Sequence, residues 1–249
     1  MPRMRFGAVA ALLALGLLAP LAQGQGAAAT SPPAPERKDI LGTETKVYSQ
    51  SDEELIIRDF FQDRRKGFFL DVGCAWPMKY NNTYYLESRL NWRGIGIDGL
   101  PDFAAAWQQK RKRSKFFNYI VTDHSGTTET FYRAGLLGIS STKPLPDPGG
   151  KAVKYDAIKV PTMTLNELLK REGVTKLDFV SMDIEGGEIL ALAGFDIDRF
   201  KPELLCVEAH IGNRETILAY FAAHGYERIE RYSTRDEVNY YFTPKPSAR

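Results

Sequence analysis

Short hydrophobic runs alternate with amphipathic segments along most of this chain. The runs are suited to strands buried on both faces, because a half-exposed strand would carry a polar residue at every second position. The segments between them have helical spacing, as Leu86 and Leu90 show by lying four residues apart. This alternation predicts an α/β domain built on a mostly parallel sheet. The predicted strands cover residues 68–70, 94–97, 116–121, 177–182 and 204–207.

Polar residues and glycines mark the ends of the predicted helices. Ser51-Asp52-Glu53-Glu54 and Thr164-Leu165-Asn166-Glu167 have the capping-box pattern that begins a helix. Further helix starts are predicted at Asn81-Asn82-Thr83, at Pro101 and at Asn213, and helix ends at Gly67, Gly173, Gly194 and Gly225. Residues 226–232 and 238–242 alternate like the strands of a hairpin, which predicts an antiparallel edge.

Residues 125–162 interrupt this regular order. Residues 128–132 and 157–160 are predicted to pair as strands. Residues 135–150 between them are rich in Gly, Ser and Pro. A loop of this length without a core of its own is typically a functional lid or a disordered segment. Its place beyond the strand ends favours a substrate lid.

Acidic residues follow nearly every predicted strand. In open α/β sheets, ligands bind beyond the carboxyl ends of the strands, so these residues predict one polar site. Asp98 is placed to accept hydrogen bonds from ribose hydroxyls, while a single Gly73 does not make the glycine-rich turn of a dinucleotide site. The residues at the strand ends are Asp71, Gly73, Asp98, Asp123, Asp183, Glu185, Glu208 and His210.

Four of these residues also have a structural interpretation. Asp183 or Glu185 could cap the helix that follows them, and Asp123 could serve a turn. His210 could be a histidine that hydrogen-bonds only to its surroundings. The basic run at residues 110–115 fits either an anion-binding patch or, as we favour, a solvated helix C-terminus.

Three segments carry a family resemblance. DVGCAWPMKYNNTYYLE, NWRGIGIDGLP and LDFVSMDIEGGEILALAGF resemble the motifs of the FkbM-type S-adenosylmethionine-dependent methyltransferases. The chain departs from that pattern at Asn81, at Asp98-Gly99, and at Ala75 and Pro77. The resemblance implies a Rossmann-like class I methyltransferase fold, with a mostly parallel seven-stranded sheet and an antiparallel edge.

The same resemblance implies a cofactor, roles and an acceptor. S-adenosylmethionine would be held by Asp71, Gly73, Asn82, Thr83, Asp98, Asp123 and Asp183. The catalytic candidates are His210, Asp183 and Glu185, with His210 or Asp183 as the base that takes the proton of an acceptor hydroxyl. That acceptor would belong to a sugar, another glycan or a small natural product. A metal clamp built from Asp183 and nearby acids is an alternative without support from a His or Cys cluster, so no metal ligand is predicted.

Two other functions stay open at this stage. One is a different nucleotide-dependent enzyme, such as an NAD-type oxidoreductase, which the missing glycines disfavour. The other is an exported, non-catalytic binding protein that keeps the Rossmann-like fold. Binding of adenosylmethionine would separate these functions from a methyltransferase.

The N-terminus has a different composition from the rest. Arg3 and Arg5 precede a hydrophobic run over residues 6–21, followed by Ala22-Gln23-Gly24, which is the pattern of a signal peptide. We therefore predict a signal peptide or membrane anchor at residues 1–24, a linker at 25–50, the methyltransferase domain at 51–243 and a tail at 244–249. Export conflicts with the use of a cytosolic cofactor.

Charge and cysteine usage add two expectations. Without Arg3 and Arg5 the 33 basic residues become 31, which equals the 31 acidic ones, so nothing in the charge calls for nucleic acid. Cys74 and Cys206 each lie at or near the end of a predicted strand. Strand ends separated by another strand are too far apart for a disulfide, so both cysteines are predicted to be buried and free.

Overall fold

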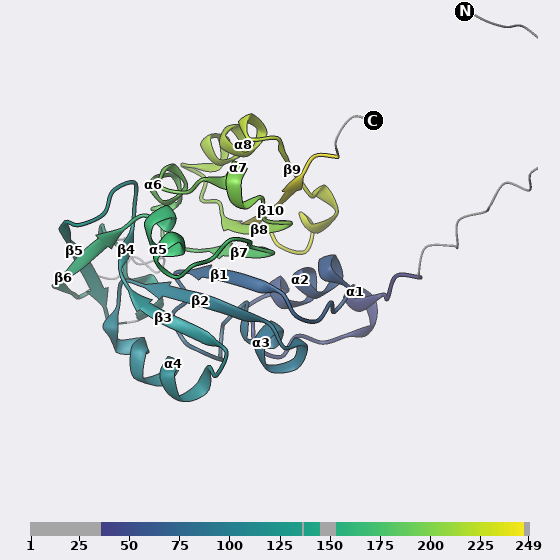
Figure 1. Ribbon diagram of the computed structural model, residues 1–249, viewed down its shortest axis with the longest axis horizontal. Coiled ribbons are helices and arrows are strands. Elements are labelled where there is room, and N and C mark those ends of the chain that lie inside the picture. Colours follow the sequence, from purple (N-terminus) through teal and green to yellow (C-terminus); the bar gives the residue numbers. More distant parts are fainter. Residues whose placement is uncertain (1–35, 136, 145–152, 247–249) are drawn as a thin grey trace, which may run out of the picture. The chain divides into compact units, whose positions relative to one another are not determined.

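A computed structural model describes residues 36–135, 137–144 and 153–246 of the 249-residue chain. Residues 37–249 form one compact unit (Figure 1). The predicted segment at 1–24 lies outside the described residues. Among the described residues, no helix is long and hydrophobic enough to cross a membrane.

The main sheet has the predicted seven strands among the described residues, in the order β3-β2-β1-β7-β8-β10-β9. Neighbouring strands are parallel except at β10, which runs antiparallel to both β8 and β9. The strands are β1 (Phe68–Val72), β2 (Arg93–Asp98), β3 (Ser114–Asn118), β7 (Phe179–Met182), β8 (Leu204–Glu208), β9 (Tyr226–Arg228) and β10 (Asn239–Pro244). The predicted class I methyltransferase fold is therefore confirmed.

Helices cover both faces of this sheet (Figure 1). One face packs against α5 (Leu165–Arg171), α6 (Glu188–Ala193), α7 (Ile197–Phe200) and α8 (Arg214–Ala223). The other packs against α2 (Glu53–Phe61) and α3 (Tyr84–Leu90). The remaining helical elements are α1 (Ile40–Thr43), α4 (Ala104–Lys110), and the short 3-10 helices η1 (Pro101–Phe103), η2 (Leu137–Ile139) and η3 (Glu230–Tyr232).

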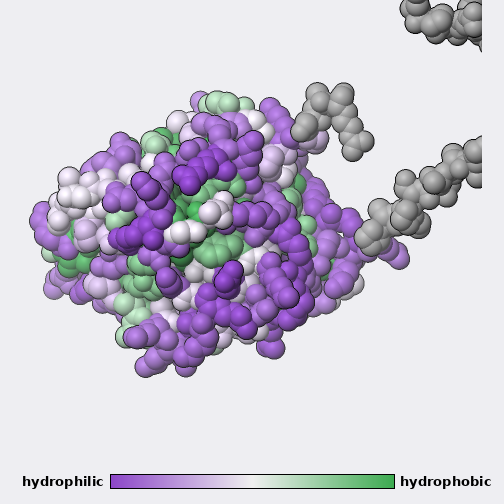
Figure 2. Space-filling model, in the orientation of Figure 1, coloured by the Kyte–Doolittle hydropathy of each residue, from purple (hydrophilic) through white to green (hydrophobic). Residues whose placement is uncertain are grey.

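The strands are hydrophobic without a break because successive side chains enter different cores. Phe69 packs on the α2–α3 side, whereas Leu70 and Val72 pack on the α5–α8 side. The same alternation separates Phe179 from Val180 on β7. The surface outside these cores is mostly hydrophilic on the face shown in Figure 2, with smaller hydrophobic areas between.

A second, three-stranded sheet accounts for the interruption after β3. Its order is β4-β6-β5, formed by β4 (Ile120–Val121), β5 (Thr128–Ala134) and β6 (Tyr155–Met163). β5 and β6 pair antiparallel, with Tyr132 opposite Ala157, so the pairing predicted for this region is confirmed. The single strand predicted at 116–121 is wrong, since β3 belongs to the main sheet and β4 to this second one.

The predicted linker extends too far along the chain in its described part. Ile40 is buried at the start of α1, and the Tyr48 ring meets the Tyr84 ring edge-on at 4.7 Å. Glu54, expected in a capping box, instead accepts hydrogen bonds from the backbone N–H groups of Val47 (3.1 Å) and Tyr48 (2.9 Å). These contacts fix the segment before Ser51 to the domain.

Other local predictions have mixed outcomes. The helix after Ser51 ends at Phe61 rather than Gly67, because Gln62 takes a left-handed conformation. Thr164 caps α5 as predicted, accepting from the N–H of Glu167 at 3.1 Å. Asn213 precedes α8 but makes no side-chain cap bond. Cys74 and Cys206 are buried and free, as predicted.

Candidate functional site

A narrow pocket lies beyond the carboxyl ends of β1, β2 and β7, where the second sheet meets the first. Gly73, Asp98, Asp183 and Glu185, all predicted site residues, line it. The rest of its wall comes from neighbouring backbone turns and from the second sheet region. Those residues are Val72, Ala75, Ile97, Gly99, Tyr119, Ile120, Val121, Phe131, Gly138, Ser140, Thr142, Ile184 and Gly187.

A larger cavity of about 740 Å³ lies at the opposite edge of the sheet. Its lining includes Phe68 and Arg93, the first residues of β1 and β2, so it faces the amino ends of the strands. The acids at the carboxyl ends do not reach it. In parallel sheets ligands bind at the carboxyl edge, and the smaller pocket is therefore the candidate site.

Asp98 ends β2 and is held in place by two backbone groups. Its Oδ2 accepts from the N–H of Ala75 at 2.9 Å, and its Oδ1 accepts from the N–H of Leu100 at 2.8 Å. Burial raises the pKa of Asp98 to about 6, although both hydrogen bonds act to lower it. Each oxygen keeps lone-pair capacity for a further donor, so the carboxylate is oriented without being saturated.

Gly73 allows the turn after β1 to touch the end of β7. Its φ of +78° lies in the left-handed region, and a Cβ at this position would come within 1.7 Å of the carbonyl oxygen of Asp183. Only glycine meets both conditions at low cost. The role of Gly73 in holding the cofactor stays a prediction, and Gly73 does line the pocket.

Asp71 and Thr83, both predicted cofactor ligands, bind each other and do not line the pocket. Asp71 Oδ2 accepts from Thr83 Oγ1 at 2.7 Å and from Asn81 Nδ2 at 3.1 Å. Asp71 lies two residues after Phe69 on β1, and so it faces the α3 side of the sheet like Phe69. Burial raises the pKa of Asp71, while Thr83 and Arg111 act to lower it.

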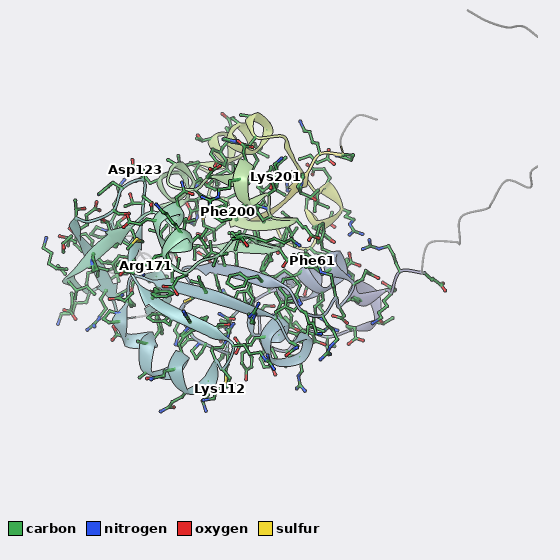
Figure 3. All side chains as sticks on the ribbon, viewed as in Figure 1. Phe61, Lys112, Asp123, Arg171, Phe200 and Lys201 are labelled. Atoms are coloured by element: carbon green, nitrogen blue, oxygen red, sulfur yellow. The ribbon has the colours of Figure 1, made fainter. Side chains whose placement is uncertain are left out.

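Arg111, which was assigned to a solvated basic run, is the buried centre of this group. It is 3% exposed, and its Nε donates to Glu87 Oε2 at 2.6 Å. Its other nitrogens donate to Thr83 Oγ1 at 2.9 Å and to Asn81 Oδ1 at 3.0 Å. Burial acts to raise the pKa of Glu87, but Arg111 and its other partners hold it below the ordinary value. Lys112, the next residue, does project from the domain as expected (Figure 3).

Asn82 and Asp123 are also placed away from the pocket. Asn82 Nδ2 donates to Ser181 Oγ at 3.2 Å, which links the start of α3 to β7. Asp123 is exposed at the rim of the domain, where it binds His124 at 2.8 Å (Figure 3). Tyr119, Ile120 and Val121, just before it, line the pocket instead. The prediction that Asp123 contacts the cofactor has no geometric support, because the chain turns away after β4.

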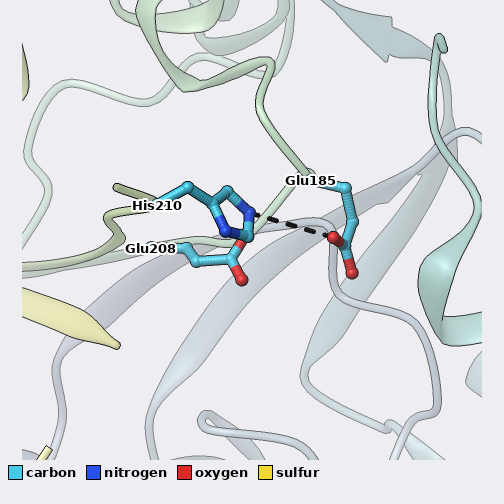
Figure 4. Close-up of side chains that lie close together, drawn as sticks. All are labelled: Glu185, Glu208 and His210. Carbon is cyan, nitrogen blue, oxygen red and sulfur yellow. Dashed lines mark ion pairs between the residues drawn. The ribbon is translucent and has the colours of Figure 1, made fainter. Parts of the chain in front are cut away.

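The predicted catalytic residues do come together, and Glu208 joins them (Figure 4). His210 Nε2 lies 2.9 Å from Glu208 Oε2 and 3.9 Å from Glu185 Oε2. Burial, followed by the adjacent Asp183, raises the pKa of Glu208 to about 10. Burial, then Asp183 and Glu188, raises the pKa of Glu185 to about 7. Asp183 is exposed at the pocket wall, and desolvation of its carboxyl by the neighbouring protein raises its pKa.

Glu188 braces the loop that carries Asp183 and Glu185. It is fully buried, and its Oε1 accepts from the N–H groups of Ile184 at 3.1 Å and Gly186 at 3.2 Å. Its Oε2 accepts from Asn213 Nδ2 at 3.0 Å. The residue at the N-cap of α6 is Gly187, so neither Asp183 nor Glu185 caps this helix. The alternative capping role considered for them is therefore wrong.

The sequence did not predict that residues of β5 and of the segment after it line the pocket. Phe131 on β5, with Ser140 and Thr142 after it, forms one wall. Ser141 pairs with Tyr132 by two backbone hydrogen bonds of 2.8 and 3.3 Å, which folds this segment back onto β5. The available signal was the lid prediction for 135–150, although residues 136 and 145–150 of that segment lie outside the described residues.

Solved structures resemble this fold at low sequence identity. A TehB-like SAM-dependent methyltransferase from Corynebacterium glutamicum is 15% identical with a TM-score of 0.45, over 83% of this chain and 92% of that one. A precorrin-6y C5,15-methyltransferase from Geobacter metallireducens is 12% identical with a TM-score of 0.44, over 78% and 87%. A SAM-dependent methyltransferase from Geobacter sulfurreducens, in complex with S-adenosyl-L-homocysteine, is 10% identical with a TM-score of 0.34, over 76% and 70%. No curated protein matches this chain in sequence.

The family itself is identified by a direct match in sequence. The methyltransferase FkbM domain matches residues 67–228, from just before β1 to the end of β9. This span contains the pocket, the Arg111 group and the acids around His210. The chain thus belongs to the FkbM methyltransferase family, whose methyl donor is S-adenosylmethionine.

Proposed function

We propose that this enzyme methylates a hydroxyl oxygen of a small-molecule or glycan acceptor. The observation that carries the proposal is that the cofactor pocket and a group of acids with raised pKa values share Asp183 and Glu185. The pocket supplies the place for the cofactor. The acids and His210 supply groups able to take a proton from a hydroxyl, which the transfer to oxygen requires.

The residues fit the cofactor. Asp98 presents an oriented carboxylate with capacity to accept from ribose hydroxyls, and the Gly73 turn leaves the backbone free of side-chain atoms. Asp183 and Glu185 bring carboxyl groups to the same wall, and a ligand with ammonium and sulfonium groups would favour their ionised form. When bound, S-adenosylmethionine supplies a methyl group already activated by its positively charged sulfur.

Opening of the second-sheet wall is part of the proposal. The pocket has a free volume of about 60 Å³, well below the roughly 300 Å³ or more of typical ligand sites. Gly138, Ser140 and Thr142 form a part of the wall that lies in no strand of either sheet. We expect this segment to move outward as the cofactor enters, as a lid does.

Calorimetry with S-adenosylhomocysteine tests the cofactor assignment. Asp98→Ala should weaken binding by about ten- to a hundredfold, since a charge-assisted hydrogen bond contributes about 1.5–3 kcal/mol. Asp123→Ala is the matched control, because Asp123 is exposed and outside the pocket, and its affinity should stay unchanged. Equal affinities of both variants would remove Asp98 from the site. No binding by the unmodified chain would favour the non-catalytic alternative.

The base is the next element to test. His210→Ala and Asp183→Asn should be compared for turnover and for S-adenosylhomocysteine affinity. Loss of a general base lowers the rate about 10²–10⁴-fold, and this loss should exceed any loss of S-adenosylhomocysteine affinity, to which Asp183 can also contribute from the pocket wall. If only Asp183→Asn has this effect, Asp183 is the base. If only His210→Ala has it, the base is His210.

We also propose that the N-terminal segment carries the domain to the cell envelope, where it works tethered. Arg3, Arg5 and the hydrophobic run after them support this, while the acceptor that it meets there fits a glycan better than nucleic acid. Deleting residues 1–24 should leave cofactor affinity intact, because residues 37–249 form a compact unit of their own. Full-length protein with an intact N-terminus in the soluble cytosolic fraction would contradict the proposal.

A further inference from the structure

Glu185, Glu208 and His210 place three donor atoms around one point at the end of β8 (Figure 4). His210 Nε2 is 2.9 Å from Glu208 Oε2 and 3.9 Å from Glu185 Oε2, and all three donor atoms lie within 4.8 Å of one another. We propose that these residues bind a divalent transition-metal ion.

An unpaired carboxyl oxygen of Glu208 is independent evidence that these residues bind a ligand. Glu208 is 8% exposed, and its Oε2 has no hydrogen-bond partner among the described residues. His210 Nε2 is close, but it does not point a hydrogen at this oxygen in hydrogen-bond geometry. Buried carboxylate oxygens normally have a donor or a cation. A metal ion between the two side chains would satisfy the oxygen and the ring nitrogen together.

The distances suit a six-coordinate ion. Donor atoms about 2.1 Å from an ion are roughly 3.0 Å apart when adjacent and roughly 4.2 Å apart when opposite. The two measured separations, 2.9 and 3.9 Å, fall close to this range. One imidazole with two carboxylates suits Mn²⁺, Fe²⁺ or Zn²⁺ better than Ca²⁺, which takes only oxygen ligands.

The charge balance also calls for a cation. Among the described residues, no Lys or Arg forms an ion pair with Glu185 or Glu208. As ligands of an ion, two carboxylates and an imidazole would together carry two negative charges, which a divalent ion neutralises. The His210 side chain is 44% exposed and that of Glu185 is 19% exposed, so an ion has a route of entry and positions left for water or substrate.

The role of the ion rests on the proposed function. Glu185 belongs both to the ion site and to the wall of the cofactor pocket. An acceptor oxygen in an open coordination position would therefore lie next to the cofactor, and the ion would make its hydroxyl more acidic. With the ion bound, His210 is a ligand, and Asp183 is the base that receives the acceptor proton.

Manganese binding to the full-length chain tests the site directly. Protein freed of metal with EDTA and then dialysed should take up one equivalent of Mn²⁺, measured as loss of the free Mn²⁺ signal in electron paramagnetic resonance. Glu208→Gln and His210→Ala should each weaken binding by at least about tenfold, because each removes a ligand. His224→Ala is the control, since His224 pairs with Asp198 at 2.9 Å on another part of the surface.

The outcomes separate this proposal from the function it rests on. Glu185→Gln, in a loop outside the buried core, gives a second variant if one of the others fails to fold. The site is overturned if no Mn²⁺ binds, or if the three ligand variants bind as tightly as His224→Ala does. S-adenosylhomocysteine affinity is measured in EDTA, without metal. Its retention together with a failure to bind Mn²⁺ would reject the ion and leave the methyltransferase in place.

Discussion

Two groups of carboxylates in this part of the fold differ in what neutralises them. Asp71 and Glu87 are buried in one group, whereas in the other Glu208 is buried, Glu185 is half-buried and Asp183 is exposed. Asp71 and Glu87 surround the Arg111 guanidinium, and Thr83 and Asn81 fill the remaining hydrogen bonds. Asp183, Glu185 and Glu208 have only His210 as a basic neighbour, and one Glu208 oxygen has no donor among the described residues. Carboxylates thus stabilise the fold in the first group, whereas in the second group they are available to bind a ligand.

The difference shows how a folded protein can retain acidic side chains whose desolvation costs free energy. A buried carboxylate with a complete set of partners holds elements together, and here it joins β1, α3 and the end of α4. A carboxylate left incomplete costs free energy unless it takes up a proton, as the raised pKa of Glu208 indicates, or binds a cation. Perturbed pKa values alone do not separate the two groups, because the pKa of Asp71 is raised as those of Asp183 and Glu185 are. The hydrogen-bond partners do.

Removing the cation from the first group should have the largest effect. Arg111→Met leaves Asp71 and Glu87 buried without their charge partner, which costs about 3–5 kcal/mol of unfolding free energy. Urea unfolding followed by circular dichroism measures this. Arg113→Met, at an exposed position two residues later, should change stability by less than about 0.5 kcal/mol. Similar stabilities of the two variants would mean that the Arg111 group is not structural.

Forcing apart β1 and β7, which carry Asp71 and lead to Asp183, should have the next largest effect on stability. Gly73 follows Asp71 by two residues and touches Asp183, so Gly73→Ala pushes β1 away from β7. The clash with a backbone carbonyl costs about 1–3 kcal/mol, in addition to about 1–2 kcal/mol for a left-handed alanine. Gly126→Ala isolates the second contribution, since Gly126 has a φ of +84° and open space around it. Equal losses of urea stability in the two variants would contradict the close approach.

Replacing one acid in each group by glutamine tests the comparison itself. Glu87→Gln should cost about 1.5–3 kcal/mol, because Arg111, Ser114 and two backbone N–H groups lose a charged acceptor. Glu208→Gln in metal-free buffer should cost less than about 1 kcal/mol, because Glu208 Oε2 has no donor among the described residues and the glutamine amide can still hydrogen-bond to the Asp183 carboxyl. The measurement is the difference in unfolding free energy between the variants. A larger loss for Glu208→Gln would reverse the assignment of the two groups.

Asp98 is intermediate between the two groups in how fully its oxygens are hydrogen-bonded. The pH dependence of S-adenosylhomocysteine affinity should show this. Its oxygens accept two backbone N–H groups, but burial raises its pKa to about 6. Ribose hydroxyls donate to the ionised carboxylate, so S-adenosylhomocysteine affinity should be full above pH 7. Affinity should then fall as the pH drops through 6, by up to about tenfold per pH unit, as binding becomes linked to loss of a proton. Calorimetry on Asp98→Asn should give a weaker affinity with a flatter pH dependence, and an identical profile would assign the titration to another group.

The hydrophobic pattern was sufficient to predict the alternation of strands and helices, apart from the division of residues 116–121 between β3 and β4. Runs such as residues 94–97 and 204–207 can be buried on both faces only in a covered parallel sheet, and the spacing of Leu86 and Leu90 fits one helical face. The polar strand ends likewise predicted Gly73, Asp98, Asp183 and Glu185 at one pocket. These are local properties, because each depends on residues within one turn or one strand.

Tertiary structure alone decided which of the strand-end acids face the pocket and which are neutralised. Asp71 turns toward Thr83 because it is two residues from Phe69 on the pleated strand, and Asp123 points outward because the chain leaves the main sheet after β3. Arg111 is indistinguishable from Lys112 in a basic run until α4 packs beside α3. Glu185 and His210 meet only because β7 and β8 are adjacent and parallel, which brings their carboxyl ends together. Such proximity depends on strand order and register, and no spacing within the sequence encodes it.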